Sequence, residues 1–174
     1  MSYPKPLNTP YPLIDADPHV KRVISYMRPT DYAIWGGATF AAPAALNFWE
    51  RIDPSKSAGY SLRNAGRLAT VVGFVGGFLL AYQSSAQRFL GFKENEREQE
   101  MDMEEMTKRA KQGLPLYGES DLTPYMQGVA ARNSTYSVFK IQAIPWFNFV
   151  NHPYHGVDVA KYYKAAGVPV PSAN

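Results

Sequence analysis

Two long stretches without a charged residue dominate the hydropathy pattern of this chain. The first runs from Tyr32 to Trp49 and the second from Leu68 to Gln87. A helix needs about 17 to 25 mainly apolar residues to cross the hydrocarbon core of a bilayer. The pattern therefore predicts two transmembrane helices, which we assign to residues 31–50 and 65–90.

The residues that border these stretches are the types that favour membrane interfaces. Aromatic rings mark both ends of the first stretch: Tyr32, Trp35, Phe48 and Trp49. Amphipathic rings of this kind are enriched at the two headgroup layers. Long basic side chains next to a span can extend to the lipid headgroups. On this ground we predict headgroup contacts for Arg63, Arg67 and Arg88.

Small residues recur at four-residue spacing in both stretches, which places them on one face of each helix. They are Ala33, Gly37, Ala41 and Ala45 in the first helix, and Ala69, Gly73, Gly77 and Ala81 in the second. Membrane helices associate through close backbone approach along such faces. We predict that the two faces pack on each other or that one packs on a partner helix. Mere abundance of alanine and glycine in membrane helices is the alternative.

The competing interpretation of the two stretches is a pair of buried helices in a soluble bundle. Such helices carry polar residues at regular helical spacing along one face. Neither stretch shows that spacing. The membrane interpretation is therefore favoured, although both stretches contain more alanine and glycine than leucine and isoleucine.

The remaining segments differ in character from the two apolar stretches. Prolines predict an extended arm over residues 1–30, and turn-forming residues predict a polar loop over 51–64. Good helix formers predict a charged extramembrane helix over 92–112, and proline-broken aromatic sequence predicts a mostly irregular tail over 113–174. The predicted fold is an all-α membrane protein, a two-helix transmembrane hairpin with these appendages.

Both the charged helix and the tail carry apolar residues that suggest contact with other chains. Met103, Met106 and Ala110 form a narrow apolar stripe on the helix, which is typical of packing on a partner. The tail is rich in aromatic residues but is broken by prolines. We expect it to bury these rings against other chains.

Charge and composition exclude several classes of function. The formal net charge is only +3, and the basic residues form no continuous stripe, so we expect no nucleic-acid partner. The chain contains no cysteine, which excludes disulfides, thiolate metal sites and cysteine nucleophiles. The first residues lack the pattern of a cleaved targeting peptide.

No group of residues makes a convincing catalytic or cofactor site, and we expect neither. His152, His155 and Asp158 are spaced three apart, but Pro153 argues against a regular helix there, so ordinary hydrogen-bonding histidines are favoured over a metal site. The glycines between Gly73 and Gly77 lack the spacing of a phosphate-binding loop. No ionisable residue interrupts either apolar stretch, which argues against a carrier.

Several short motifs resemble a known family. They are Tyr11-Pro-Leu-Ile-Asp-Ala-Asp-Pro-His-Val, Arg28-Pro-Thr-Asp-Tyr and Trp35-Gly-Gly, followed by the glycine-rich second stretch and the charged segment from Lys93 to Lys111. Together they are similar to the fungal 20.9/21 kDa accessory subunits of mitochondrial NADH:ubiquinone oxidoreductase, respiratory complex I. The arm is the most specific of these motifs, because composition alone does not demand it.

The resemblance implies a multi-pass accessory subunit in the inner mitochondrial membrane. It implies other subunits of the membrane arm as partners, a role in assembly and stability, and no cofactor of its own. Membrane phospholipids, including cardiolipin, are candidate ligands of the flanking arginines. Basic residues in the loop place it in the matrix and both termini in the intermembrane space. The alternatives are a free-standing inner-membrane adaptor or assembly factor and, less favoured, an enzyme or carrier.

Overall fold

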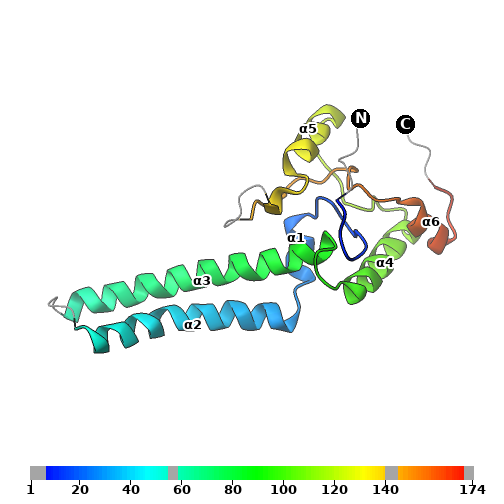
Figure 1. Ribbon diagram of the computed structural model, residues 1–174. Coiled ribbons are helices and arrows are strands. Elements are labelled where there is room, and N and C mark those ends of the chain that lie inside the picture. Colours follow the sequence, from blue (N-terminus) through cyan, green and yellow to red (C-terminus); the bar gives the residue numbers. More distant parts are fainter. Residues whose placement is uncertain (1–6, 55–58, 140–144, 171–174) are drawn as a thin grey trace. The chain divides into compact units, whose positions relative to one another are not determined.

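The computed structural model describes residues 7–54, 59–139 and 145–170. Its elements, in chain order, are α1 (Val20–Ser25), α2 (Pro29–Ile52), α3 (Gly59–Phe89), α4 (Glu96–Lys111), α5 (Pro124–Ser134), η1 (Ser137–Phe139) and α6 (Ala160–Ala166) (Figure 1). Within the described ranges there is no β-strand, and a single bridge joins His19 to Asn148. The prediction of an all-α protein is confirmed for these residues.

The chain divides into two compact units. We call Met27–Ser85 the hairpin unit, and Met1–Tyr26 together with Ala86–Asn174 the arm-tail unit. The first contains α2 and most of α3, and the second contains the other elements. The arm-tail unit is therefore assembled from segments that lie on both sides of the hairpin in the sequence.

In the hairpin unit α2 and α3 run antiparallel, side by side (Figure 1). Two glycines of α3 lie in close contact with the backbone of α2. A Cβ atom at Gly73 would lie 2.5 Å from the carbonyl oxygen of Ala38, and one at Gly77 would lie 2.8 Å from that of Trp35. The indole N–H of Trp35 also donates to the carbonyl of Phe74 at 3.0 Å. Only glycine permits this backbone separation.

The start of α2 is well determined by local sequence. Pro29 occupies the first helical position, where its missing N–H costs nothing. The carboxylate of Asp31 accepts the backbone N–H of Arg28 at 2.7 Å, which satisfies a donor at the helix entrance. Proline and aspartate at these positions fix the point where the chain enters the hairpin.

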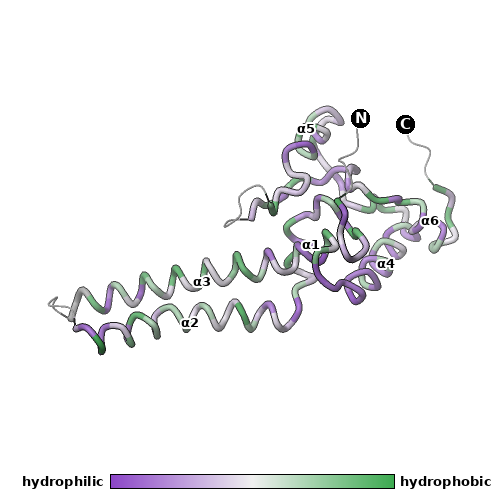
Figure 2. The backbone as a smooth tube through the Cα atoms, in the orientation of Figure 1, coloured by the Kyte–Doolittle hydropathy of each residue, from purple (hydrophilic) through white to green (hydrophobic). Residues whose placement is uncertain are grey.

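The two helices of the hairpin differ in how well they match a membrane span. Of the described helices, α3 is long and apolar enough to cross a membrane. The candidate span is Leu62–Phe89, with a mean hydropathy of 1.5. The core helix of a soluble protein can have the same length and hydropathy, but such a helix is mostly buried, whereas only 22% of the apolar stretch of α3 is buried. The two-span prediction is thus not confirmed for α2, which has few large aliphatic residues. Figure 2 shows α4 as strongly hydrophilic and the middle of α3 as largely apolar.

Several predicted boundaries shift in the structure. The arm is not extended throughout, because His19 caps α1 by accepting the backbone N–H of Lys21 at 3.1 Å. α3 begins at Gly59, inside the loop predicted over 51–64. Loop residues 55–58, including Lys56, lie outside the described residues, as do residues 1–6 of the arm. α4 begins at Glu96 rather than residue 92.

The tail packs against its own chain more than its sequence suggests. Met106 and Ala110 of α4 form an apolar core with Leu116 and Tyr162, and Tyr162 is fully buried. The expectation that tail aromatics are buried only by other chains was therefore wrong for Tyr162. Three other rings of the tail are more than half exposed: Tyr125, Trp146 and Phe149. Their burial against other chains stays a prediction.

The glycine contact between α2 and α3 leads to a prediction with a matched control. Gly73→Ala and Gly76→Ala gain the same intrinsic helix propensity. A Cβ atom at Gly76 has nothing within 4 Å, whereas at Gly73 it meets the backbone of Ala38. We expect the free energy of unfolding of Gly73→Ala to be about 1–3 kcal/mol lower than that of Gly76→Ala. Denaturant titration of the full chain in mild detergent measures it. Equal stability of the two variants would show that the helices do not pack at Gly73.

Candidate functional site

The predicted helix-packing residues fall on two faces that do not meet. On α3, Gly73, Gly77 and Ala81 are buried and Ala69 is half-buried. On α2, the four predicted small residues are all exposed: Ala33, Gly37, Ala41 and Ala45. The α3 face instead meets Ala38 and Ala42.

A large residue of α2 packs on α3 beside the small ones. The ring of Trp35 packs on Phe74 and Phe78, with centroids 5.1 Å apart in both pairs. This anchor turns Trp35, Ala38 and Ala42 toward α3, since residues three, four and seven apart share a face. The predicted contact between the two small-residue faces is therefore not made, and packing of the exposed α2 face on a partner helix stays a prediction.

The three arginines predicted to contact lipid headgroups have different environments. Arg63 and Arg67 are exposed. Arg88 is 4% exposed, and its Nε lies 3.4 Å from a carboxylate oxygen of Glu98. The headgroup prediction for Arg88 is corrected, because α4 follows α3 after a short turn and supplies an internal acidic partner.

The main polar feature of the arm-tail unit is a buried network that sequence inspection did not identify. Its acidic members in the arm are Asp15 and Asp17, which are 0% and 1% exposed. Buried carboxylates require charged partners or hydrogen bonds to offset the loss of hydration. The partners come from α1, α4, α5 and the tail. We call this set the arm-tail network: Asp15, Asp17, Arg22, Asp102, Glu105, Ser134, His152, His155 and Tyr162.

Arg22 of α1 connects the arm to α4. Its guanidinium contacts Asp15 at 3.0 Å, Asp102 at 2.6 Å and Glu105 at 3.4 Å. Tyr26 donates its hydroxyl to the same Glu105 oxygen at 2.7 Å. A planar guanidinium with five donors is suited to such multiple contacts.

His155 connects the tail to Asp15. Its Nδ1 lies 2.6 Å from a carboxylate oxygen of Asp15, and its Nε2 lies 2.6 Å from the backbone oxygen of His152. Both of these neighbours are acceptors, so the ring satisfies them only when both nitrogens carry protons. Tyr117 stacks on the ring at a centroid distance of 3.6 Å. His155 is thus a second side-chain partner of Asp15 beside Arg22.

His152 makes a parallel connection to Asp17, but as a neutral ring. Its Nε2 lies 2.8 Å from the Asp17 carboxylate, while its Nδ1 accepts the backbone N–H of Tyr154 at 3.2 Å. A ring that donates on one side and accepts on the other is uncharged. Ser134 of α5 also donates its hydroxyl to Asp17.

Backbone hydrogen bonds join the same segments. The N–H of Ala16 donates to the carbonyl of His155 at 2.9 Å, and that of Val20 donates to Asn148 at 2.8 Å. The N–H of Tyr136 donates to the carbonyl of Ala16 at 3.1 Å. The arm is therefore held to the tail by both main-chain and side-chain contacts.

The pKa values of the network acids shift in opposite directions. Burial by itself raises the pKa of Asp15, but the charges of His155 and Arg22 outweigh it and hold that pKa below its usual range. Burial also raises the pKa of Asp102, and Arg22 only partly offsets this, so the pKa stays above its usual range. Asp15 has His155 as a further partner, which Asp102 lacks, and the nearby charge of Asp15 adds to the raised pKa of Asp102.

Two tyrosines beside the network also have shifted pKa values. Burial, reinforced by nearby carboxylates, raises the pKa of Tyr162 and that of Tyr117. Tyr162 donates its hydroxyl to Asp102. The hydroxyl of Tyr117 is buried and has no hydrogen-bond partner among the described residues.

The role of this network is structural. Its histidines and arm carboxylates are at most 3% exposed, so a dissolved substrate cannot reach them. Their charges and hydrogen bonds are used within the chain. Across the described residues, no group of three or more metal-ligating side chains is placed to hold an ion. The predicted preference for hydrogen-bonding over metal-ligating histidines agrees with the contacts of His152 and His155.

Comparison with known proteins gives matches over nearly the whole chain. A model of the 21 kDa subunit of NADH-ubiquinone oxidoreductase complex I matches residues 8–94, and a model of the C-terminal part of that subunit matches residues 103–168. The NADH-ubiquinone oxidoreductase 20.9 kDa subunit of Neurospora crassa is 54% identical over 162 residues, which are 93% of this chain and 86% of that protein. The arm-tail network joins residues from both matched segments.

The two tyrosines give a paired prediction. Tyr162→Phe removes the donor to a buried carboxylate and is expected to lower the free energy of unfolding by about 2 kcal/mol, whereas Tyr117→Phe removes an unpartnered hydroxyl and is expected to be nearly neutral. Denaturant titration of the full chain in mild detergent at pH 8 measures both. Equal losses in the two variants would contradict this assignment of the hydroxyls.

The raised pKa values of Tyr117 and Tyr162 predict that the stability of the folded chain depends on pH. Their folded pKa values lie above the unfolded value of about 10, so their stabilising contribution is complete below that pH and is lost as the pH rises above it. The wild-type chain should therefore lose stability between about pH 10 and 11, and Tyr117→Phe should lose less. Parallel pH curves for the wild type and the variant would argue against the shifted pKa of Tyr117.

Proposed function

Because the chain belongs to the family of 21 kDa subunits of NADH-ubiquinone oxidoreductase, complex I, we propose that it is a non-catalytic accessory subunit of the membrane arm. In this role it supports assembly and stability of the mitochondrial respiratory enzyme. It carries no flavin, iron–sulfur or quinone chemistry of its own. Its partners are other subunits of complex I and the phospholipids around them.

The observation that best supports this role is the combination of a buried polar network and exposed apolar helices. The network uses its ionisable groups to hold the arm and tail together and leaves none of the buried histidines for catalysis. The hairpin unit instead exposes large apolar side chains along both of its helices. Examples are Phe40, Phe48, Trp49, Leu68, Val72 and Leu80. Surfaces of this kind require lipid or protein to cover them.

The dimensions of the hairpin fit a membrane location. At 1.5 Å per residue, Leu62–Phe89 is about 42 Å long, which exceeds the hydrocarbon core of about 30 Å. α2 is also long enough, and its exposed aromatic rings near both ends, Tyr32 and Trp49, suit the headgroup layers. We therefore propose that both helices cross the inner mitochondrial membrane, with Arg63 and Arg67 near phospholipid headgroups, including cardiolipin.

Native gel electrophoresis of mild-detergent extracts of mitochondria tests the proposed role. The chain should migrate with the NADH-oxidising band in amounts equal to core subunits, as measured by mass spectrometry. Cells without the chain should accumulate smaller particles. NADH oxidation per assembled complex should be unchanged, because the chain supplies no reacting group.

Three outcomes would contradict this role. Presence only in smaller particles would favour an assembly factor, and migration apart from the complex would favour a free-standing adaptor. Normal assembly with a lower rate per complex would favour a direct part in turnover. Re-expression of the wild-type chain is the control that ties any defect to its loss.

The orientation of the hairpin is testable because the chain has no cysteine. We propose that the connection between α2 and α3 faces the matrix, since it is flanked by Arg51 in the last turn of α2 and by Arg63 and Arg67 in α3. A single cysteine at Asp53→Cys should resist a membrane-impermeant maleimide while the inner membrane is intact and react once it is permeabilised. Immediate labelling would place the connection in the intermembrane space.

A further inference from the structure

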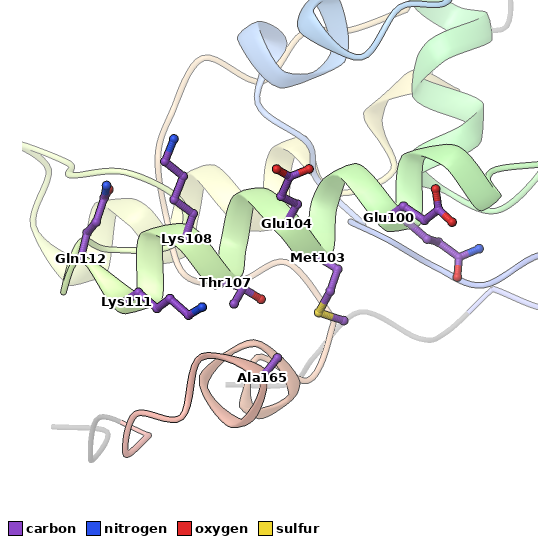
Figure 3. A pocket seen from close by; sticks show the side chains of 9 residues that line it. Glu100, Met103, Glu104, Thr107, Lys108, Lys111, Gln112 and Ala165 are labelled. Carbon is purple, nitrogen blue, oxygen red and sulfur yellow. The ribbon is translucent and has the colours of Figure 1, made fainter.

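A shallow groove runs along the outer side of α4, and α6 borders one side of it (Figure 3). Met103 of α4 and Ala165 of α6 approach each other across its lower edge in this view. Met103 remains 37% exposed. The groove is open along its length, unlike the enclosed cavities that bind small molecules.

The groove exists because α4 uses only part of its apolar stripe internally. Met106 and Ala110 pack into the core with Tyr162. Met103, from the same predicted stripe, lies outside that core. The network acids on α4, Asp102 and Glu105, are likewise turned inward toward Arg22. The inward face of α4 is therefore satisfied by its own chain, and the groove face is not.

Charged side chains along the groove are separated by sign. Glu100 and Glu104 lie toward the start of α4, and Lys108 and Lys111 lie toward its end. The ion pairs within the described residues do not include any of these four side chains. The groove thus presents an apolar strip with an acidic end and a basic end.

We infer that this groove docks an amphipathic helix of another complex I subunit, running antiparallel to α4. Helices favour acidic residues in their first turn and basic residues in their last. An antiparallel helix with that ordinary arrangement places its basic end beside Glu100 and Glu104. Its acidic end then lies beside Lys108 and Lys111, and its apolar stripe covers Met103.

The length of the groove sets the size of the docked segment. Glu100 to Lys111 spans about 16 Å of helix, or three turns. Recognition by a helix in a groove uses apolar residues at positions i, i+3 or i+4, and i+7. The docked segment should therefore show this spacing over about eleven residues. The inference rests on the proposed function, since it takes the partner from complex I.

Site-specific photo-crosslinking in the assembled complex tests this inference. Benzoylphenylalanine replaces Met103 in the full chain, and mass spectrometry maps the products after irradiation. The expected product is one peptide of one other complex I subunit, with apolar residues at helical spacing, a basic residue toward Glu100 and an acidic residue toward Lys108. The matched control is the same probe at Met126, which is also exposed but lies on α5, and which should not yield that peptide.

A charge reversal adds an independent measurement. Lys108→Glu should lower the fraction of the chain retained in the complex after a salt wash by about threefold to fivefold, as expected for an exposed charge contact. Lys21→Glu makes the same change at an exposed position outside the groove and should leave retention unchanged. Equal retention of the two variants would count against the charge complementarity.

Other crosslinking outcomes would overturn the inference. These are products with a second copy of this chain, products with lipid only, a peptide without the charge pattern, or no product at position 103. If the chain still migrates with complex I in equal amount, such a result removes the docking site and leaves the proposed function standing. If the chain does not migrate with the complex, the proposed function itself fails.

Discussion

The guanidinium of Arg22 lies within 3.4 Å of three carboxylates, one from the arm and two from α4. Asp15 and Asp102 are buried and cannot rely on water to stabilise their charges, whereas Glu105 is partly exposed. Burial alone lowers the pKa of Arg22, but Asp15, Asp102 and Glu105 outweigh it and keep the group positive. Removing one partner of such a set is costly because the others are left buried and unpaired. Arg22 is therefore the charged group that links the arm to α4.

Asp15 also connects the arm to the tail. His155 shares this carboxylate with Arg22, and His152 pairs with Asp17 two residues further along the arm. Segments more than 130 residues apart are joined in this way. The arm-tail unit also buries apolar side chains, among them Val23, Phe89, Leu90, Met106 and Tyr162. We attribute part of its specificity to the polar contacts. Burial of polar groups in well-satisfied networks fixes one arrangement among several possible ones.

The sequence predicted the helices better than the contacts between them. Long apolar stretches and strong helix formers located α2, α3 and α4, because these signals are local. The small-residue face of α3 could also be identified, since close approach requires glycine. The face of α2 could not, because α2 turns Trp35, Ala38 and Ala42 toward α3 and not the small residues at four-residue spacing. The membrane assignment of α2 stays a prediction, since among the described helices only α3 is both long and apolar enough over one continuous stretch to count as a candidate span.

The arm-tail network lay beyond sequence inspection because its members are spread along the chain. Asp15 and Asp17 stood in the most distinctive motif of the arm, yet nothing local indicated that they are buried. His152 and His155 were recognised as hydrogen-bonding residues, but a single sequence contains no sign of their partners. A signal was present in retrospect, since two acids in an otherwise apolar and proline-rich segment require cations somewhere in the fold.

The central claim is that Arg22 holds the arm, α4 and the tail together as one cooperative unit. Hydrogen exchange of the full chain in mild detergent, compared between wild type, Arg22→Met and Arg97→Met, tests it most directly. Arg97 is a suitable control because its side chain is 45% exposed. We predict that Arg22→Met lowers protection together at Ala16, at Val20 and across α4, while Arg97→Met changes little. Loss of protection confined to α1, with the amide of Ala16 that bonds the tail unaffected, would contradict the account.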